Sequence, residues 1–149
     1  SFADAAEELS SIVDPLPGTF LPAEVEFWLG YSYFQLEQYS DAKDSLLAGI
    51  TSLGNERLDP WTLPFYEQMV FQAAASSYFT GEYAKSVELI EPVITRISAD
   101  YAPFAYLVLI DSLNETGNDQ DAVKYLQDAR KKYSGTEFAG DFSELVGGQ

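Results

Sequence analysis

Residues 39–49 read Tyr39-Ser40-Asp41-Ala42-Lys43-Asp44-Ser45-Leu46-Leu47-Ala48-Gly49. This stretch contains a pattern that occurs four times in the chain. The pattern is an aromatic or acidic residue, then a small residue three positions later, then in most copies an aliphatic residue four positions after that. Its copies are Phe2-Ala5-Leu9-Ile12, Tyr39-Ala42-Leu46-Gly49, Tyr83-Ser86-Ile90-Val93 and Asp119-Ala122-Leu126-Ala129. The small residues lie 37, 44 and 36 positions apart (42 − 5, 86 − 42 and 122 − 86). Periods of this length are typical of arrays of helical repeats.

Each of the last three copies is preceded by another helical stretch. The first such stretch contains Leu29-Gly30-x-x-Tyr33, and the turns before the last two copies read Gly81-Glu82-Tyr83-Ala84-Lys85-Ser86 and Gly117-Asn118-Asp119-Gln120-Asp121-Ala122. These motifs resemble the tetratricopeptide repeat (TPR) family, in which they let the two helices of a repeat approach closely. Glycine at these turns accepts the left-handed conformation that ends a helix. Two departures are Glu26, where the family has a bulky apolar residue, and Glu37, which replaces a turn glycine.

The resemblance covers residues 1–133 and implies an all-α fold, an α-solenoid of antiparallel helix pairs in a single domain over residues 1–149. The expected parts are a half-repeat at 1–18, about three full repeats at 22–54, 63–98 and 101–133, and a capping helix at 136–146. The expected helices are 2–14, 22–36, 39–52, 63–79, 83–97, 101–115, 119–132 and 136–146. Proline is tolerated in a first turn, as expected for Pro22, Pro64 and Pro103, whereas Pro92 predicts a kink or break.

The composition excludes several kinds of chemistry. Cysteine and histidine are both absent, which removes thiolate sites, the commonest general base and the commonest metal ligand. The sequence has no glycine-rich phosphate loop and no nucleophile elbow. We therefore expect no cofactor, no metal and no enzymatic activity. The alternative is a carboxylate hydrolase, in which two acids such as Glu24 and Asp111 would have to face each other across a cleft.

The charge indicates what kind of partner to expect. A formal net charge of −16 disfavours nucleic acids and anionic lipid surfaces. It favours an apolar or basic protein or peptide and would speed the encounter with a cationic one. The alternative is that the charge serves solubility alone. No stretch approaches the roughly 18 apolar residues of a membrane span, so direct membrane insertion is not expected.

The family resemblance also implies a binding surface, because the first helix of each TPR pair lines the concave face of the array. On each first helix, the residues spaced by three and four positions that would point into this face are Glu24, Phe27, Tyr31, Phe34, Gln68, Phe71, Ala75, Tyr78, Phe104, Leu107, Asp111 and Asn114. This groove is aromatic with acidic edges and has no cation, so it cannot clamp a peptide carboxylate. Aromatic stripes at helical spacing can equally belong to the core. Trp61, in the insertion 54–61, either contacts a partner or packs against a neighbouring helix.

The first copy of the pattern, Phe2 to Ile12, matches the second helix of a repeat, and no first helix precedes it. We expect either a longer parent protein or a chain that opens with half a repeat. Homo-oligomerisation through this half-repeat is therefore an alternative function. The segment 131–139 is similar to junctions of bacterial envelope TPR proteins, which weakly favours the periplasm or cell envelope over the cytoplasm.

Overall fold

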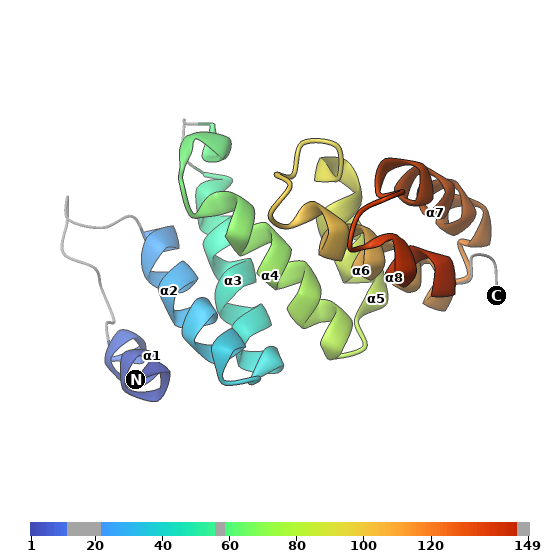
Figure 1. The fold of residues 1–149 in the computed structure, drawn as a ribbon. Coiled ribbons are helices and arrows are strands. Elements are labelled where there is room, and N and C mark those ends of the chain that lie inside the picture. Colours follow the sequence, from blue (N-terminus) through green and yellow to red (C-terminus); the bar gives the residue numbers. More distant parts are fainter. Residues whose placement is uncertain (12–21, 56–58, 146–149) are drawn as a thin grey trace. The chain divides into compact units, whose positions relative to one another are not determined.

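The computed structural model describes residues 1–11, 22–55 and 59–145 (Figure 1), and within these residues every regular element is a helix. The elements are α1 (Phe2–Ser10), α2 (Pro22–Gln35), α3 (Tyr39–Leu53), the 3-10 helix η1 (Pro60–Thr62), α4 (Tyr66–Phe79), α5 (Tyr83–Ile90), the 3-10 helix η2 (Glu91–Val93), α6 (Ala102–Glu115), α7 (Asp119–Lys132) and α8 (Ala139–Glu144). The predicted all-α fold is confirmed, and neighbouring helices pack as in a TPR-like helical repeat. The expected helical residues 12–14 and 146 lie outside the described residues.

Prolines account for two of the larger differences from the expected helix bounds, at the start of α4 and the end of α5; helix α8 also begins at Ala139 instead of residue 136. Helix α5 ends at Ile90 and a 3-10 turn containing Pro92 follows, so the predicted break is confirmed. Pro103 lies in the first turn of α6, as expected. The expectation for Pro64 was wrong, because α4 begins only at Tyr66. Leu63 is extended, with φ −84° and ψ 127°, which is the conformation that a following proline favours.

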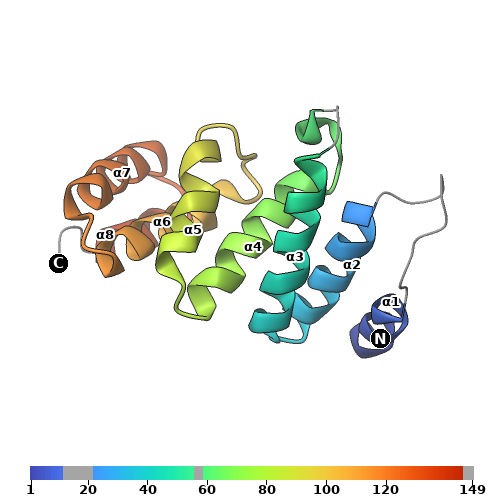
Figure 2. The same ribbon diagram turned by 180° about the vertical axis from the view of Figure 1, so that it is seen from behind.

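The chain forms two compact units, and their boundary falls inside the expected repeat 63–98. The N-terminal unit comprises residues 1–80 and the C-terminal unit residues 81–149. In the N-terminal unit α1 packs on α2, α2 on α3 and α3 on α4, as Figures 1 and 2 show. In the C-terminal unit α5 packs on α6, α6 on α7 and α7 on α8. The single domain over residues 1–149 stays a prediction.

Helices α2 and α3 approach closely at Gly30. A Cβ atom at this position would lie 2.5 Å from Cγ of Leu46, so only glycine fits between the two helices. The small residues Ala42, Ser86 and Ala122 are fully buried, as the repeated pattern predicts. In α1 the buried residue is Ala6, and Ala5 is half-buried instead of tightly packed. Among the described residues α1 packs mainly against α2, and Ala6 is its one buried residue.

The turns between paired helices share one backbone geometry. Gly81 and Gly117 have φ of +80° and +77°, as predicted for helix-ending glycines, and Glu37 adopts the same left-handed conformation with φ +59°. After α2 the N–H of Gln38 donates to the Tyr33 carbonyl at 2.9 Å, and after α6 the N–H of Asn118 donates to the Leu113 carbonyl at 2.8 Å. These are the six-to-one bonds of a Schellman motif. The motif is thus kept at Glu37 although the glycine is not.

Replacing Ala42 with leucine is expected to lower the free energy of unfolding by about 1–3 kcal/mol, because the added carbons have no room in a fully packed contact. Chemical denaturation followed by circular dichroism would measure the change. Ala48→Leu is the matched control, since Ala48 is exposed on the same helix and should leave the midpoint nearly unchanged. Equal midpoints for the two variants would contradict the packing of α3 against α2.

Candidate functional site

The exposed face of α2 is rotated from the face expected in the groove. Phe27, expected there, is only 2% exposed, and its ring stacks on that of Phe65 with the centroids 5.4 Å apart. Phe65 is the residue before α4 and ends the segment that contains the insertion. The expectation for Phe27 was therefore wrong: this segment brings an aromatic ring over Phe27 and makes it part of the core.

Trp28 occupies the centre of the face that α2 leaves open, and its side chain is 47% exposed. Glu24 and Tyr31, both half-buried, lie four residues before it and three after it, on the same side of the helix. The centroid of the Tyr31 ring lies 5.7 Å from that of the Trp28 ring, in a T-shaped pair. It also lies 5.7 Å from the ring centroid of Phe2 on α1, and Phe2 is 44% exposed. We refer to Phe2, Glu24, Trp28 and Tyr31 as the Trp28 surface.

Sequence reasoning missed Trp28, although a signal for it exists. Phe27, Trp28 and Leu29 are consecutive bulky apolar residues in a helix. Successive helical positions are about 100° apart, so three such side chains cannot all face one core. One of them had to be exposed, but periodicity alone does not say which.

A second group of aromatic rings lies at the end of the N-terminal unit where α2 turns into α3 and where α4 finishes. The Phe34 ring is 5.5 Å from that of Tyr39, and Tyr39 stacks on Phe79 with the centroids 4.5 Å apart. The Tyr78 ring also contacts Phe79, at 5.4 Å. Phe34 and Tyr78, both expected in the groove, are half-buried, whereas Phe79 is 54% exposed. Sequence reasoning missed Phe79 as well.

The remaining expected groove residues of α4 are partly covered. Gln68 and Phe71 are half-buried, and Ala75 between Phe71 and Tyr78 is buried. None of the five aromatic residues expected in the groove of the N-terminal unit is exposed. Phe27 is buried, and the other four are half-buried: Tyr31, Phe34, Phe71 and Tyr78. The exposed aromatic area is instead supplied by their neighbours on the same helices.

In the C-terminal unit the expected face of α6 is the open one. Phe104 is 49% exposed, and its ring lies 5.7 Å edge-to-face from that of Phe138. Leu107, Asp111 and Asn114 follow along the same side of the helix and are half-buried. Asp111 and Glu24 belong to different units, so the hydrolase alternative is not tested.

Trp61 packs against its own chain. The side chain is half-buried, and its ring lies 5.1 Å edge-to-face from that of Tyr66 in α4. The backbone N–H of Trp61 donates to the carboxylate of Asp59 at 3.1 Å, which fixes the start of η1. This arrangement agrees with the interpretation of Trp61 as a residue tucked against a neighbouring helix. A partner contact at Trp61 stays a prediction.

Two lysines of α7, Lys124 and Lys132, lie over tyrosine rings of their own unit. Lys132 Nζ is 5.6 Å from the centroid of the Tyr106 ring and 5.7 Å from that of Tyr133. Beside them the Tyr125 hydroxyl donates to Oε1 of Glu91 at 3.1 Å. Burial, and then this bond to a carboxylate, raise the pKa of Tyr125 to about 12.

This pKa predicts an alkaline loss of stability. The folded-state pKa of Tyr125 lies above its ordinary value of 10.0, so its contribution is complete below pH 10 and is lost as the pH rises toward 12. Tyr125→Phe should flatten the fall of the melting temperature between these pH values. A smaller alkaline loss should remain, because burial also raises the pKa of Tyr106 and Tyr133. Identical profiles for the variant and the parent chain would contradict the raised pKa of Tyr125.

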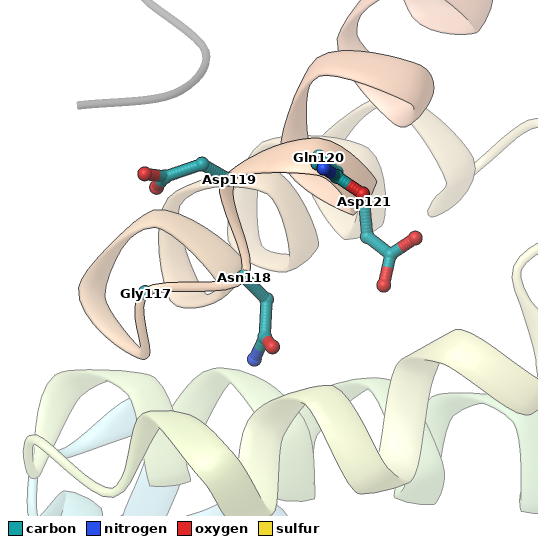
Figure 3. Close-up of a pocket in the computed structure, with 5 residues that line it drawn as sticks. All are labelled: Gly117, Asn118, Asp119, Gln120 and Asp121. Atoms are coloured by element: carbon teal, nitrogen blue, oxygen red, sulfur yellow. The ribbon is translucent and has the colours of Figure 1, made fainter.

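A shallow pocket lies at the turn between α6 and α7, lined by Gly117, Asn118, Asp119, Gln120 and Asp121 (Figure 3). The carboxylates of Asp119 and Asp121 point in opposite directions, and the Asn118 amide nitrogen donates to the Thr116 hydroxyl at 2.9 Å. In the described parts of the chain no group of three or more acidic, histidine or cysteine side chains is placed to hold a metal ion. The pocket therefore offers no converging ligands.

Comparison with known proteins gives one family match, over part of the C-terminal unit. The model of the tetratricopeptide repeat family matches residues 104–136, which run from α6 through α7. No curated protein and no solved structure matches the chain. Among the helices that the structure describes, none is both long and apolar enough to cross a bilayer.

Proposed function

We propose that this chain, whose residues 104–136 are a tetratricopeptide repeat, is a scaffold that binds a peptide or protein partner through the exposed sides of its first helices. The first helices are α2, α4 and α6; the second helices are α3, α5 and α7. A repeat of this family indicates a protein–protein interaction module. We also propose that the chain is part of a larger protein or assembly.

One observation supports the proposal above others: each first helix carries an exposed large aromatic side chain. These residues are Trp28 on α2, Phe79 on α4 and Phe104 on α6. Exposed aromatic side chains are the commonest anchors of protein interfaces. Within each unit we therefore propose the exposed aromatic residues as anchors, Trp28 and Phe79 in the N-terminal unit and Phe104 in the C-terminal unit, beside the half-buried groove residues of the same helices.

The charges of the first helices favour an apolar or basic partner. Helices α2, α4 and α6 contain no lysine or arginine, and all basic residues lie in second helices or connecting segments. A peptide carboxylate would find no cation on these helices, which argues against a carboxylate clamp. We also propose that the chain is not an enzyme, since it lacks histidine and cysteine. A periplasmic or envelope location stays a prediction from the segment 131–139.

The test compares partner capture by the intact chain and by its variants in extracts of the source cell. Phe79→Ala combined with Phe104→Ala should reduce recovery of the bound protein at least tenfold, because two exposed anchors are lost while the core is untouched. Val123→Ala is the matched control, since Val123 is an exposed apolar residue on the second helix α7. If the double variant captures the partner normally and Trp61→Ala does not, the inserted segment is the binding site instead.

Homo-oligomerisation through α1 is a second candidate, favoured by the exposure of Phe2 and the partial exposure of Leu9 on that helix. Ile12, which was expected on the same face, lies outside the described residues. Each copy carries a net charge of −16, so self-association should strengthen as salt screens the repulsion. Sedimentation equilibrium at low and high salt tests this candidate. A monomer under both conditions would remove it.

A further inference from the structure

We propose that the Trp28 surface binds a cationic segment of a protein partner, with a lysine or arginine side chain lying over the indole ring of Trp28 and paired with the carboxylate of Glu24. This inference rests on the proposed function and specifies the partner chemistry at one first helix. The probe that represents the partner is a lysine- and arginine-bearing amphipathic peptide.

The rings around Trp28 leave about half of its side chain exposed to a ligand. The Tyr31 ring forms T-shaped pairs with those of Trp28 and Phe2, and the ring of the buried Phe27 lies 4.9 Å from the indole. The indole is thus supported from within while 47% of the side chain remains exposed. Tryptophan is the best of the aromatic rings for a cation, and a ring held by neighbours loses little freedom on binding.

A carboxylate stands beside this ring. Glu24 lies one helical turn before Trp28, so the Cβ atoms of the two residues are about 5–6 Å apart on the same side of α2. A guanidinium or ammonium group over the indole is therefore within reach of the Glu24 carboxylate. An apolar side chain would instead cover this carboxylate without pairing it, which carries a desolvation cost.

The charge distribution gives the strongest reason for a cationic partner. Residues 1–42 contain eight acidic residues and no lysine, arginine or histidine. The acidic residues are Asp4, Glu7, Glu8, Asp14, Glu24, Glu26, Glu37 and Asp41. In the C-terminal unit, lysines of α7 lie over the aromatic rings of Tyr106, Tyr125 and Tyr133 and form cation–π contacts with them. The segment that builds the Trp28 surface has no such residue of its own, so a cation on its rings must come from outside the segment.

The same charges argue against two other occupants. A second copy of the chain would bring another net charge of −16 to the contact, and an anionic membrane would be repelled in the same way. A cationic peptide is attracted by this field at long range. Its binding should weaken as salt is added.

The experiment uses the full chain with Trp61→Phe, so that Trp28 is the single tryptophan and its fluorescence reports on the surface. The probe is a capped amphipathic 16-residue peptide with arginine and lysine on one side and leucine on the other, at about 50 mM salt. The control peptide has glutamine in place of every basic residue. We expect the cationic peptide to bind at least tenfold more tightly than the glutamine peptide and to change Trp28 fluorescence.

Variants separate this surface from general attraction to an acidic protein. Trp28→Ala leaves the charge unchanged and should weaken peptide binding about tenfold by calorimetry, as loss of an anchor does. Glu24→Gln should weaken binding severalfold, whereas Glu115→Gln, an equal charge change on the exposed end of α6, should not. Similar binding to Trp28→Ala and the parent chain would overturn the inference, as would equal affinity for both peptides.

Three further outcomes decide between this inference, the proposed function and self-association. If the peptide does not bind Trp28 but the Phe79 and Phe104 double variant loses the cellular partner, the cationic site is wrong and the scaffold function stands. If the chain dimerises and Trp28→Ala abolishes the dimer, the occupant is a second copy and the inference is overturned. If the peptide binds as expected and the double variant still captures the partner normally, the Trp28 surface stands alone and the wider first-helix surface is wrong.

Discussion

Phe27→Ala is expected to lower the free energy of unfolding of the N-terminal unit by about 3–5 kcal/mol, the usual cost of truncating a buried phenylalanine. Phe27 is 2% exposed and stacks on Phe65, so the variant loses its contacts and leaves a cavity between α2 and the start of α4. This cost is a large part of the stability of an ordinary domain. Urea denaturation followed by circular dichroism would measure it.

Trp28→Ala is the control for this prediction, because it removes a larger aromatic side chain from the adjacent position. Trp28 is 47% exposed, so the stability loss should stay below about 1 kcal/mol. The two variants should therefore separate the two roles: Phe27→Ala destabilises the fold, and Trp28→Ala weakens binding. If Trp28→Ala destabilised the unit as strongly as Phe27→Ala, the assignment of core and surface on α2 would be reversed.

The contrast between Phe27 and Trp28 marks the limit of sequence reasoning for this site. The spacing of residues along α2 predicts which of them share a side of the helix, and Glu24 and Tyr31 do lie on the open side. The core side is decided by Phe65, a residue nearly 40 positions away at the end of a segment whose length departs from the repeat period. Local periodicity carries no information about that packing partner.

The helices themselves were more accessible to prediction. Their bounds follow from apolar spacing together with proline and glycine signals, which act through the local backbone. The motifs that contain Gly30 and Ala42 predict a close approach of α2 and α3. The clash that a Cβ at Gly30 would make with Leu46 confirms it. Glu37 shows the reverse case, because its left-handed conformation is imposed by the Schellman turn and not by its own preference.

The remaining prediction concerns the C-terminal unit: Phe142→Ala is expected to lower its free energy of unfolding by about 3–5 kcal/mol. Phe142 is fully buried, and its ring stacks on that of Tyr133 with the centroids 5.2 Å apart and the planes inclined by 13°. Helix α8 spans only Ala139–Glu144, and a helix this short is not stable without packing. Phe142 is the one buried residue of α8 and therefore its main apolar contact, so the variant tests the prediction that α8 caps the repeat.

Arg130 holds the same helix by a different interaction, which allows the two contributions to be separated. Its Nε donates to the Phe142 carbonyl at 2.8 Å and its Nη2 to the Leu145 carbonyl at 2.9 Å, where the end of α8 leaves carbonyls without helical partners. Arg130→Lys keeps the charge but not the fork of donors, so it should cost less than Phe142→Ala. Phe104→Ala, at an exposed site in the same unit, should cost under about 1 kcal/mol.

Hydrogen exchange then distinguishes a cap from an appendage. If α8 is a cap, Phe142→Ala should speed exchange in residues 139–144 and also in α7, because Tyr133 at the end of α7 loses its cover. If exchange rises in α8 alone and the denaturation midpoint of the unit is unchanged, α8 contributes nothing to the stability of the repeat. The last helix would then be an addition to a repeat that is already complete at α7.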